Sequence, residues 1–120
     1  MCYDIDGDSY ADLIGFGASY VYVAYSTGNS FGSPIAVLSN FAVNNGGWVT
    51  FDKYPRCVGS YQGYKSPASI IGFGDAGVYI SHFVSRNSFT APTMVINNNY
   101  GYNAGGDKQI FYGKKISSKF

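Results

Sequence analysis

Charged residues are scarce in this chain of 120 residues, at 12% of the sequence, against roughly a quarter in ordinary globular proteins. The net charge is +1 and no basic stripe is present, so nucleic acid is not an expected partner. No apolar run approaches the roughly 20 residues that a transmembrane helix requires. Acidic residues also stand near the start, where a signal peptide would have its apolar segment. We therefore expect a soluble chain without a membrane partner, of unknown localisation.

Cysteine and histidine are also rare, so most kinds of metal-binding and catalytic sites that use these side chains are not expected. Cys2 and Cys57 are too few for a disulfide framework, and we expect buried thiols in equivalent strands, with a bridge between them as the alternative. His82 has no second imidazole with which to bind zinc, so we expect it to cap or face solvent. No nucleophile elbow or phosphate loop is present, and the acids cluster in one place instead of facing each other across a cleft. The sequence does not predict an enzyme.

A repeat dominates what is present, in a chain rich in tyrosine, phenylalanine and glycine. Gly15-Phe16-Gly17 recurs as Gly72-Phe73-Gly74, an offset of 57 residues. Each copy continues through an alternating run, a Ser-Phe…Pro turn and an Asn-rich loop with a Gly-Gly pair, at 21–23 and 78–80, 30–34 and 88–92, and 40–48 and 99–107. A period of roughly 50 residues built from short strands is typical of propeller-like arrays.

The repeat predicts an all-β fold of propeller blades, with one small antiparallel sheet in each copy. Alternation and glycine-containing turns place strands near 12–16, 20–25, 34–39, 56–60, 69–73, 77–83 and 92–97, with hairpin turns at 17–19 and 74–77. The predicted units are a first blade and its connecting loop (1–48), a second blade and its loop (49–107), and a tail that offers a strand to a neighbouring blade (108–120).

Four carboxylates gather near the start of the first copy and form the sharpest local motif: Asp4, Asp6, Asp8 and Asp12. This spacing places hard oxygen ligands around one turn, as Ca²⁺ requires. The alternative is an acidic turn held by side-chain hydrogen bonds to the backbone. Ser9 stands where such loops favour glycine. The second copy has no carboxylate in this region, so we expect Ca²⁺ in the first repeat only.

These motifs together resemble the repeat of the seven-bladed propeller lectins of the Psathyrella velutina and Photorhabdus type. The matching strings are the acidic loop with Ala-Asp-Leu-Ile-Gly-Phe-Gly, then Asp-Ala-Gly-Val-Tyr-Ile-Ser and Tyr-Gly-Tyr-Asn-Ala-Gly-Gly. The blades are also similar to the FG-GAP blades of integrin α-chains. Two features depart from the lectin pattern. The chain has two repeats and not seven, and Trp48 in the first copy is replaced by Asp107 in the second.

The resemblance implies a lectin that binds N-acetylglucosamine- or fucose-type sugars in pockets between blades. A sugar site needs an aromatic face and fixed polar groups, and the candidate residues are Asn44, Asn45, Trp48, Asp75, Tyr102, Asn103, Ala104 and Gly105. Packing between blades is the other interpretation of Trp48, and a structural turn is that of Tyr102 and Asn103. The alternative function is a Ca²⁺-stabilised scaffold or protein-interaction module without sugar binding.

Two blades do not close a propeller, because such rings normally contain about four to eight. The sequence therefore predicts a cyclic homo-oligomer, with a trimer of six blades favoured. Residues 114–120 are predicted to complete the first blade of the next chain as a latch. The rival explanation is that the chain is a piece of a longer seven-repeat lectin.

Overall fold

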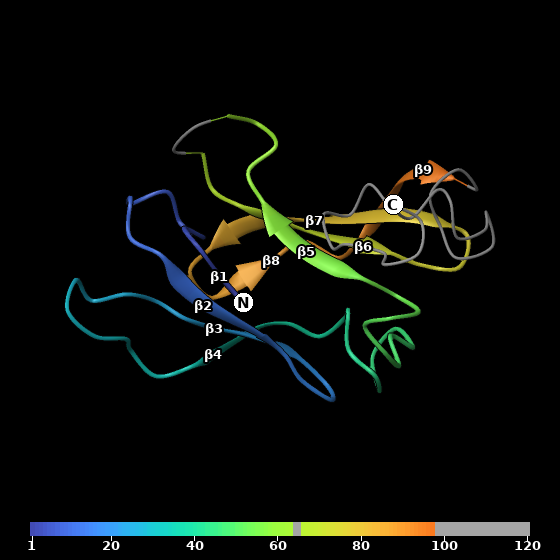
Figure 1. The fold of residues 1–120 in the computed structure, drawn as a ribbon, viewed down its shortest axis with the longest axis horizontal. Helices are drawn as coiled ribbons and strands as arrows, with labels where there is room; N and C mark the ends of the chain where they lie inside the picture. The colour runs from blue at the N-terminus through green and yellow to red at the C-terminus, as the bar shows by residue number, and fades with distance from the viewer. Residues whose placement is uncertain (64–65, 98–120) are drawn as a thin grey trace.

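The computed structural model describes residues 1–63 and 66–97, and within them the chain forms two antiparallel sheets and no helix (Figure 1). The first sheet contains, in order, β1 (Cys2–Tyr3), β2 (Asp12–Phe16), β3 (Val21–Ala24) and β4 (Ile35–Leu38). The second contains β5 (Arg56–Gly59), β6 (Ser69–Phe73), β7 (Gly77–Ser85), β8 (Ser88–Phe89) and β9 (Thr93–Asn97). The predicted all-β fold with two small antiparallel sheets is confirmed.

The two sheets are built with the same hydrogen-bonding pattern, 57 residues apart. Ile14 pairs with Val23 in the first sheet, and Ile71 pairs with Ile80 in the second. A register shift follows at the next strand in both, between β3 and β4 and between β7 and β9. The predicted hairpin turns close with bonds from the Gly17 amide to the Tyr20 carbonyl (2.8 Å) and from the Gly74 amide to the Gly77 carbonyl (2.9 Å). The sequence repeat is therefore a structural repeat.

The first strand of each sheet shows where sequence alignment and backbone pairing differ by one residue. Cys2 pairs with Leu13, and the residue that pairs with the equivalent Ile70 is Val58. Cys2 therefore does not match Cys57. Both cysteines are free and lie in equivalent strands, β1 and β5, but Cys2 is exposed, so the prediction of a buried thiol is wrong for Cys2. Cys57 is half-buried, and burial raises the pKa of its thiol.

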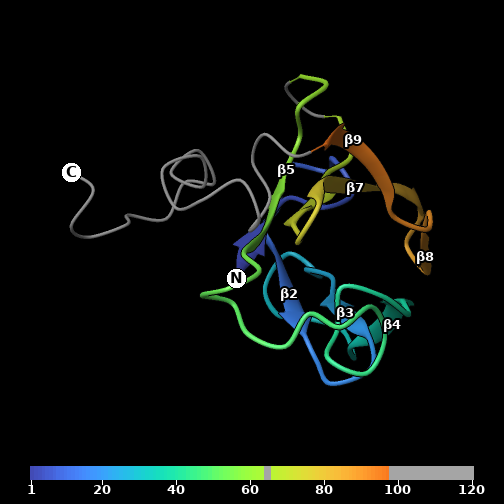
Figure 2. The same ribbon diagram turned by 90° about the vertical axis from the view of Figure 1, so that its right-hand side faces the viewer.

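The core lies between the two sheets, which Figure 2 shows on opposite sides of the molecule. The first sheet contributes the buried alternate residues Ile14, Val21, Val23 and Val37, and the second contributes Ile70 and Phe89 with the half-buried Val58 and Tyr79. The segment between the sheets adds Phe41, Trp48 and Tyr54 to the same cluster. Alternation along β2 and β3 thus decides which face of the first sheet meets the second.

The predictions that involve the 99–107 loop and the tail 108–120, including the predicted latch, concern residues outside the described ones. Among the residues that are described, no helix is long and apolar enough to cross a membrane.

Candidate functional site

A cavity of about 330 Å³ lies where the segment after β4 meets the β6–β7 hairpin. Both sides supply main-chain and side-chain groups to it. Its lining residues are Asn40, Gly46, Gly47, Trp48, Tyr54, Gly74, Asp75, Ala76, Tyr79 and Pro92. The cavity therefore joins two predicted site residues, Trp48 and Asp75, which are separated by 27 positions in the sequence.

The polar side of the cavity is organised around Asp75. The Tyr54 hydroxyl donates to Oδ1 of Asp75 at 2.8 Å. This bond is the main reason that the pKa of Tyr54 is raised. Among the described residues, no other side chain or amide donates to the Asp75 carboxylate, which lies in an exposed hairpin turn. Asp75 thus has acceptor capacity left for a ligand hydroxyl.

Trp48 forms an aromatic wall and at the same time packs between the sheets. Its ring makes edge-to-face contacts with Phe41, Tyr54 and Tyr79, at centroid separations of 4.8, 5.8 and 6.2 Å. Its indole Nε1 donates to Oδ1 of Asn40 at 3.3 Å. The sequence left packing and ligand contact as alternatives for Trp48. The structure shows the packing directly and also places the residue in the cavity lining.

Glycine is required beside this tryptophan because the backbone comes too close for a side chain. Gly46 has φ +103°, and a methyl group there would lie 2.7 Å from Nε1 of Trp48. Gly47, which also lines the cavity, has φ +76°. Both values favour glycine. The Gly-Gly pair thus lets the main chain form part of the cavity surface.

Asn44 and Asn45 lie in the same loop but do not line the cavity. The Asn45 side chain donates to the Ser19 carbonyl at 2.5 Å, and the Asn44 side chain donates to the Ser19 hydroxyl at 3.4 Å. These bonds attach the loop to the β2–β3 turn. Four other predicted sugar-binding residues, Tyr102, Asn103, Ala104 and Gly105, lie outside the described residues, so their roles stay predictions.

Eight of the ten lining residues were not selected from the sequence, among them the polar or aromatic residues Asn40, Tyr54 and Tyr79. Tyr79 belongs to an alternating strand, where it looks like one more core residue. Asn40 is the first residue of the Asn-rich loop, and the composition of that loop was the sequence feature that could have identified it. Tyr54 stands in a segment without periodicity, and only the fold brings its hydroxyl to Asp75.

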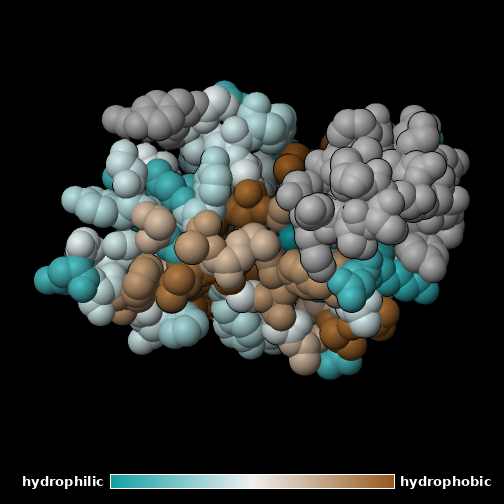
Figure 3. Space-filling model, in the orientation of Figure 1, coloured by the Kyte–Doolittle hydropathy of each residue, from teal (hydrophilic) through white to brown (hydrophobic). Residues whose placement is uncertain are grey.

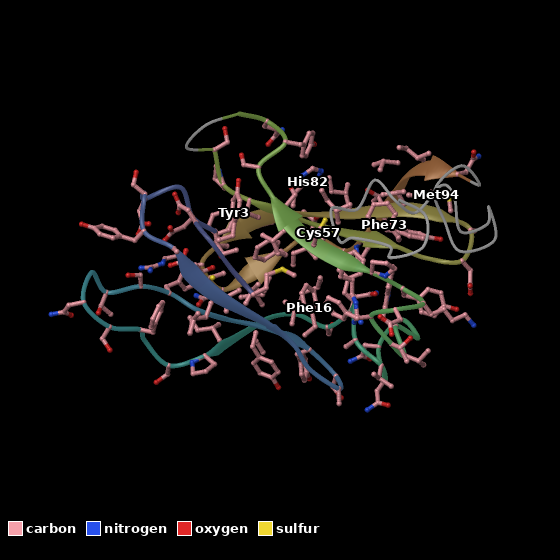
Figure 4. The ribbon with its side chains drawn as sticks, in the orientation of Figure 1. Tyr3, Phe16, Cys57, Phe73, His82 and Met94 are labelled. Carbon is pink, nitrogen blue, oxygen red and sulfur yellow. The ribbon has the colours of Figure 1, made fainter. Side chains whose placement is uncertain are left out.

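The lone histidine contributes to neither of the two candidate sites. Its Nδ1 contacts the Ser69 hydroxyl at 3.2 Å, and its ring lies 5.9 Å from the ring of Tyr61. Register places His82 on the same face of the second sheet as Cys57 (Figure 4). His82 is half-buried, and its hydrogen bond is to a hydroxyl on the neighbouring strand.

The acidic loop brings its four carboxylates together. Oxygens of Asp4, Asp6, Asp8 and Asp12 lie within 4.8 Å of one another. Asp12 is fully buried and accepts the amides of Ile5 (2.9 Å) and Ser26 (2.7 Å). Asp4 accepts the amides of Gly7, Asp8 and Ser9 at 2.8–3.1 Å. Hydrogen bonds from backbone amides therefore orient the carboxylates. The alternative interpretation of this loop, an acidic turn held by side-chain hydrogen bonds to the backbone, predicts the same bonds.

Two further features show that negative charge is concentrated in this loop. The pKa of Asp6 is raised, first by burial and then by the charges of Asp12 and Asp8. Burial and the same acidic neighbourhood raise the pKa of Tyr25 to about 12. The buried Tyr25 hydroxyl has no hydrogen-bond partner among the described residues.

Ser9 has φ 78°, so the position predicted to favour glycine does adopt a left-handed conformation.

The structure is similar to that of a lectin from Agrocybe aegerita, which was described for its specific recognition of non-reducing terminal N-acetylglucosamine. The TM-score is 0.78 and the sequence identity is 30%, over 87% of this chain and 25% of the lectin. The chain thus spans about a quarter of the length of that protein. No protein-family model and no curated protein sequence matches the chain. The structural likeness supports an all-β, lectin-like class for this protein.

Proposed function

We propose that this chain is a carbohydrate-binding lectin and that a terminal monosaccharide binds in the cavity where the segment after β4 meets the β6–β7 hairpin. The cavity itself carries the proposal, because it combines an aromatic wall with a carboxylate that has acceptor capacity left. The likeness to an N-acetylglucosamine-recognising lectin supports it and favours that sugar over a fucose-type ligand. No catalytic step is part of the proposal.

The chemistry of the lining matches the two kinds of surface that a pyranose presents. Trp48 and Tyr79 supply aromatic surface for the C–H groups of the ring. Asp75 accepts from a hydroxyl group, and the main chain at Gly46 and Gly47 offers further polar groups. A small polar ligand must replace good hydrogen bonds to water, so the affinity of a single site is expected to be weak.

Replacing Asp75 by alanine is expected to reduce affinity for N-acetylglucosamine at least tenfold. A hydrogen bond to a charged group contributes about 1.5–3 kcal/mol, and the substitution removes the only carboxylate among the described residues that line the cavity. Titration calorimetry measures the loss. Ala18 occupies the equivalent position in the first repeat, so the hairpin tolerates alanine and the melting temperature should stay within about 2 °C.

The controls separate this cavity from the 99–107 loop and from a protein that binds no sugar. Tyr54→Phe should weaken binding because Asp75 loses the hydrogen bond that holds its carboxylate in place, whereas Tyr20→Phe, in the exposed turn between β2 and β3, should have no effect. If only a Tyr102→Ala/Asn103→Ala double variant loses binding, the site belongs to that loop. A folded protein that binds nothing on a glycan array would favour the scaffold alternative.

We further infer that the acidic loop binds Ca²⁺ in a structural role. The four clustered carboxylates are the hard oxygen ligands that Ca²⁺ takes, and the buried, unpartnered hydroxyl of Tyr25 beside them supports this fit. A cation would also offset the repulsion that raises the pKa of Asp6. The loop adjoins the second sheet, because the Ile5 carbonyl accepts the Ala68 amide at 2.8 Å and Asp6 pairs with Arg86 at 3.3 Å. Ca²⁺ would therefore hold the two sheets together.

Adding Ca²⁺ at a hundredfold excess over its Kd is expected to raise the melting temperature by about 10 °C, since binding to the folded state alone contributes about 2.7 kcal/mol. Asp8→Ala should abolish this response and leave sugar affinity unchanged. Asp75→Ala should do the reverse, which makes each variant the control for the other. Loss of sugar binding on chelation, with the fold intact, would contradict a purely structural role.

A further inference from the structure

A second cavity adjoins the first cavity, in which the terminal sugar is proposed to bind. Its volume is about 290 Å³, against about 330 Å³ for the first cavity. Asn40 and Pro92 line both cavities, so the two share a boundary at these residues. The second cavity lies where β4 meets β8. Its remaining lining residues are Val37, Leu38, Ser39, Ser88, Phe89 and Ala91.

The floor of the second cavity belongs to the core and is held by packing. The floor residues are at most 9% exposed and are members of the core cluster: Val37, Leu38 and Phe89. The Phe89 ring makes an edge-to-face contact with Phe83 at a centroid separation of 5.7 Å. The rim residues are small and exposed: Ser39, Ser88 and Ala91. The second cavity therefore has a fixed apolar floor beneath an open rim.

Asn40 places hydrogen-bond donors at the boundary between the two cavities. Its Oδ1 accepts the Phe41 amide at 2.7 Å and the Trp48 indole N–H at 3.3 Å. Because both partners are donors, the side-chain atom that they reach is the oxygen, and the other atom is the NH₂ nitrogen. No group of the described residues accepts from this nitrogen. Asn40 can therefore donate to a ligand that crosses the boundary.

The lining of the second cavity suits a neutral sugar. Its apolar floor matches the C–H groups of a pyranose, and the hydroxyls of Ser39 and Ser88 can donate to or accept from sugar hydroxyls. No charged side chain stands among the described residues that line it. A carboxylate on the ligand would lose water there without gaining a counter-charge. We therefore expect a neutral hexose in preference to an acidic sugar.

We propose that the second cavity binds the sugar unit next to the terminal one, so that the protein recognises a disaccharide at the end of a glycan. This inference rests on the proposed function, in which the terminal unit occupies the first cavity. The rest of a glycan continues from the anomeric carbon of its terminal unit, and the boundary at Asn40 and Pro92 gives the next unit a path. A linked unit adds contacts without a second loss of rigid-body freedom, so it increases the affinity.

Titration calorimetry tests the proposal by comparing two kinds of ligand. Methyl β-N-acetylglucosaminide fills the first cavity alone. A panel of disaccharides joins N-acetylglucosamine to each hydroxyl group of galactose in turn, because the structure does not select a linkage. The best of them is expected to bind about tenfold more tightly than the methyl glycoside, the gain from one or two well-made hydrogen bonds. The same linkage to a uronic acid should give a smaller gain.

Substitutions at the rim locate the second unit. Ala91→Ile and Ser88→Ile each add bulk at the rim of the second cavity, and neither residue lines the first. Each variant should bind the best disaccharide no more tightly than the methyl glycoside, with unchanged affinity for the methyl glycoside. Ser33→Ile is the matched control, since Ser33 is the exposed counterpart of Ala91 in the first repeat. It also precedes a proline but lines neither cavity, so both affinities should be unchanged.

A further control addresses non-specific contact with the apolar surface. Apolar residues reach the surface over β1, β2 and β5 (Figure 3), where Leu13 is 44% exposed. Leu13→Ser should leave both affinities unchanged. Circular dichroism checks that each variant is folded.

Three results would overturn the proposal. If the methyl glycoside binds and no disaccharide binds more tightly, the second cavity is not part of the site, although the proposed function stands. If the disaccharide gain survives in both Ala91→Ile and Ser88→Ile, the second unit lies elsewhere. If a folded protein binds neither ligand, the proposed function fails and this inference fails with it.

Discussion

Arg56→Ala is expected to lower the free energy of unfolding by about 3 kcal/mol, because breaking a buried, hydrogen-bonded cation site is strongly destabilising. Arg56 is only 6% exposed, and its guanidinium donates to the carbonyls of Phe41 (2.7 Å) and Tyr54 (3.2 Å). Its charged centre lies 4.2 Å from the ring centroid of Phe51. Alanine would leave two carbonyls without their donor and a gap among aromatic rings. Urea denaturation measures the effect.

Arg86 supplies the matched control for this prediction. It also lies over an aromatic ring, that of Tyr25 at 4.4 Å, and it pairs with Asp6, but its side chain is 55% exposed. An exposed pair of this kind contributes about 0–1 kcal/mol. Burial, which lowers the pKa of Arg56 to about 10, therefore distinguishes the two arginines. If both alanine variants lost the same stability, the buried carbonyls would not depend on Arg56.

Strand positions were predictable because the apolar pattern and the repeat agree. The strand predicted at 12–16 is β2, and the one predicted at 69–73 is β6. β7 extends beyond the predicted residue 83 to Ser85, because its far end pairs with the short strand β8. That extension arises from backbone pairing across the turn at Arg86 and Asn87, with Ser88–Phe89 forming a strand instead of the predicted turn, and it leaves little trace in hydrophobic alternation.

The candidate site was predictable only in part, because side-chain direction in a loop depends on distant segments. Trp48 and Asp75 were selected as an aromatic residue and an acid in turn regions, and both line the same cavity. Asn44 and Asn45, from the same loop as Trp48, instead bind Ser19 on another turn. No local feature of the sequence indicates which of these loop side chains face the cavity and which bind Ser19.

Arg56 illustrates the same limit for the core. A single arginine at the start of a strand resembles an ordinary surface residue in the sequence. Its burial requires Phe16 from the first sheet, which Figure 4 places between β2 and β5, and Phe51 from the connecting segment. Contacts between residues that are 40 positions apart in the sequence therefore decide the role of Arg56.

Gly72→Ala is expected to cost about 1–3 kcal/mol, the usual penalty for overfilling a packed core. A methyl group on Gly72 would lie 2.5 Å from Cε1 of Phe41 and 2.7 Å from Cη2 of Trp48. Neither ring has room to retreat easily, because Trp48 contacts two further aromatic rings. Displacing Trp48 would also reshape the cavity, so affinity for N-acetylglucosamine should fall with the melting temperature.

Gly15→Ala is the control that the repeat itself provides, since Gly15 is the counterpart of Gly72 in the first sheet. No atom lies within 4 Å of the position that its methyl group would take. This change should be neutral or stabilise the chain by about 0.5–1 kcal/mol, because glycine weakens a strand interior. Equal costs for the two glycines would contradict the packing described here.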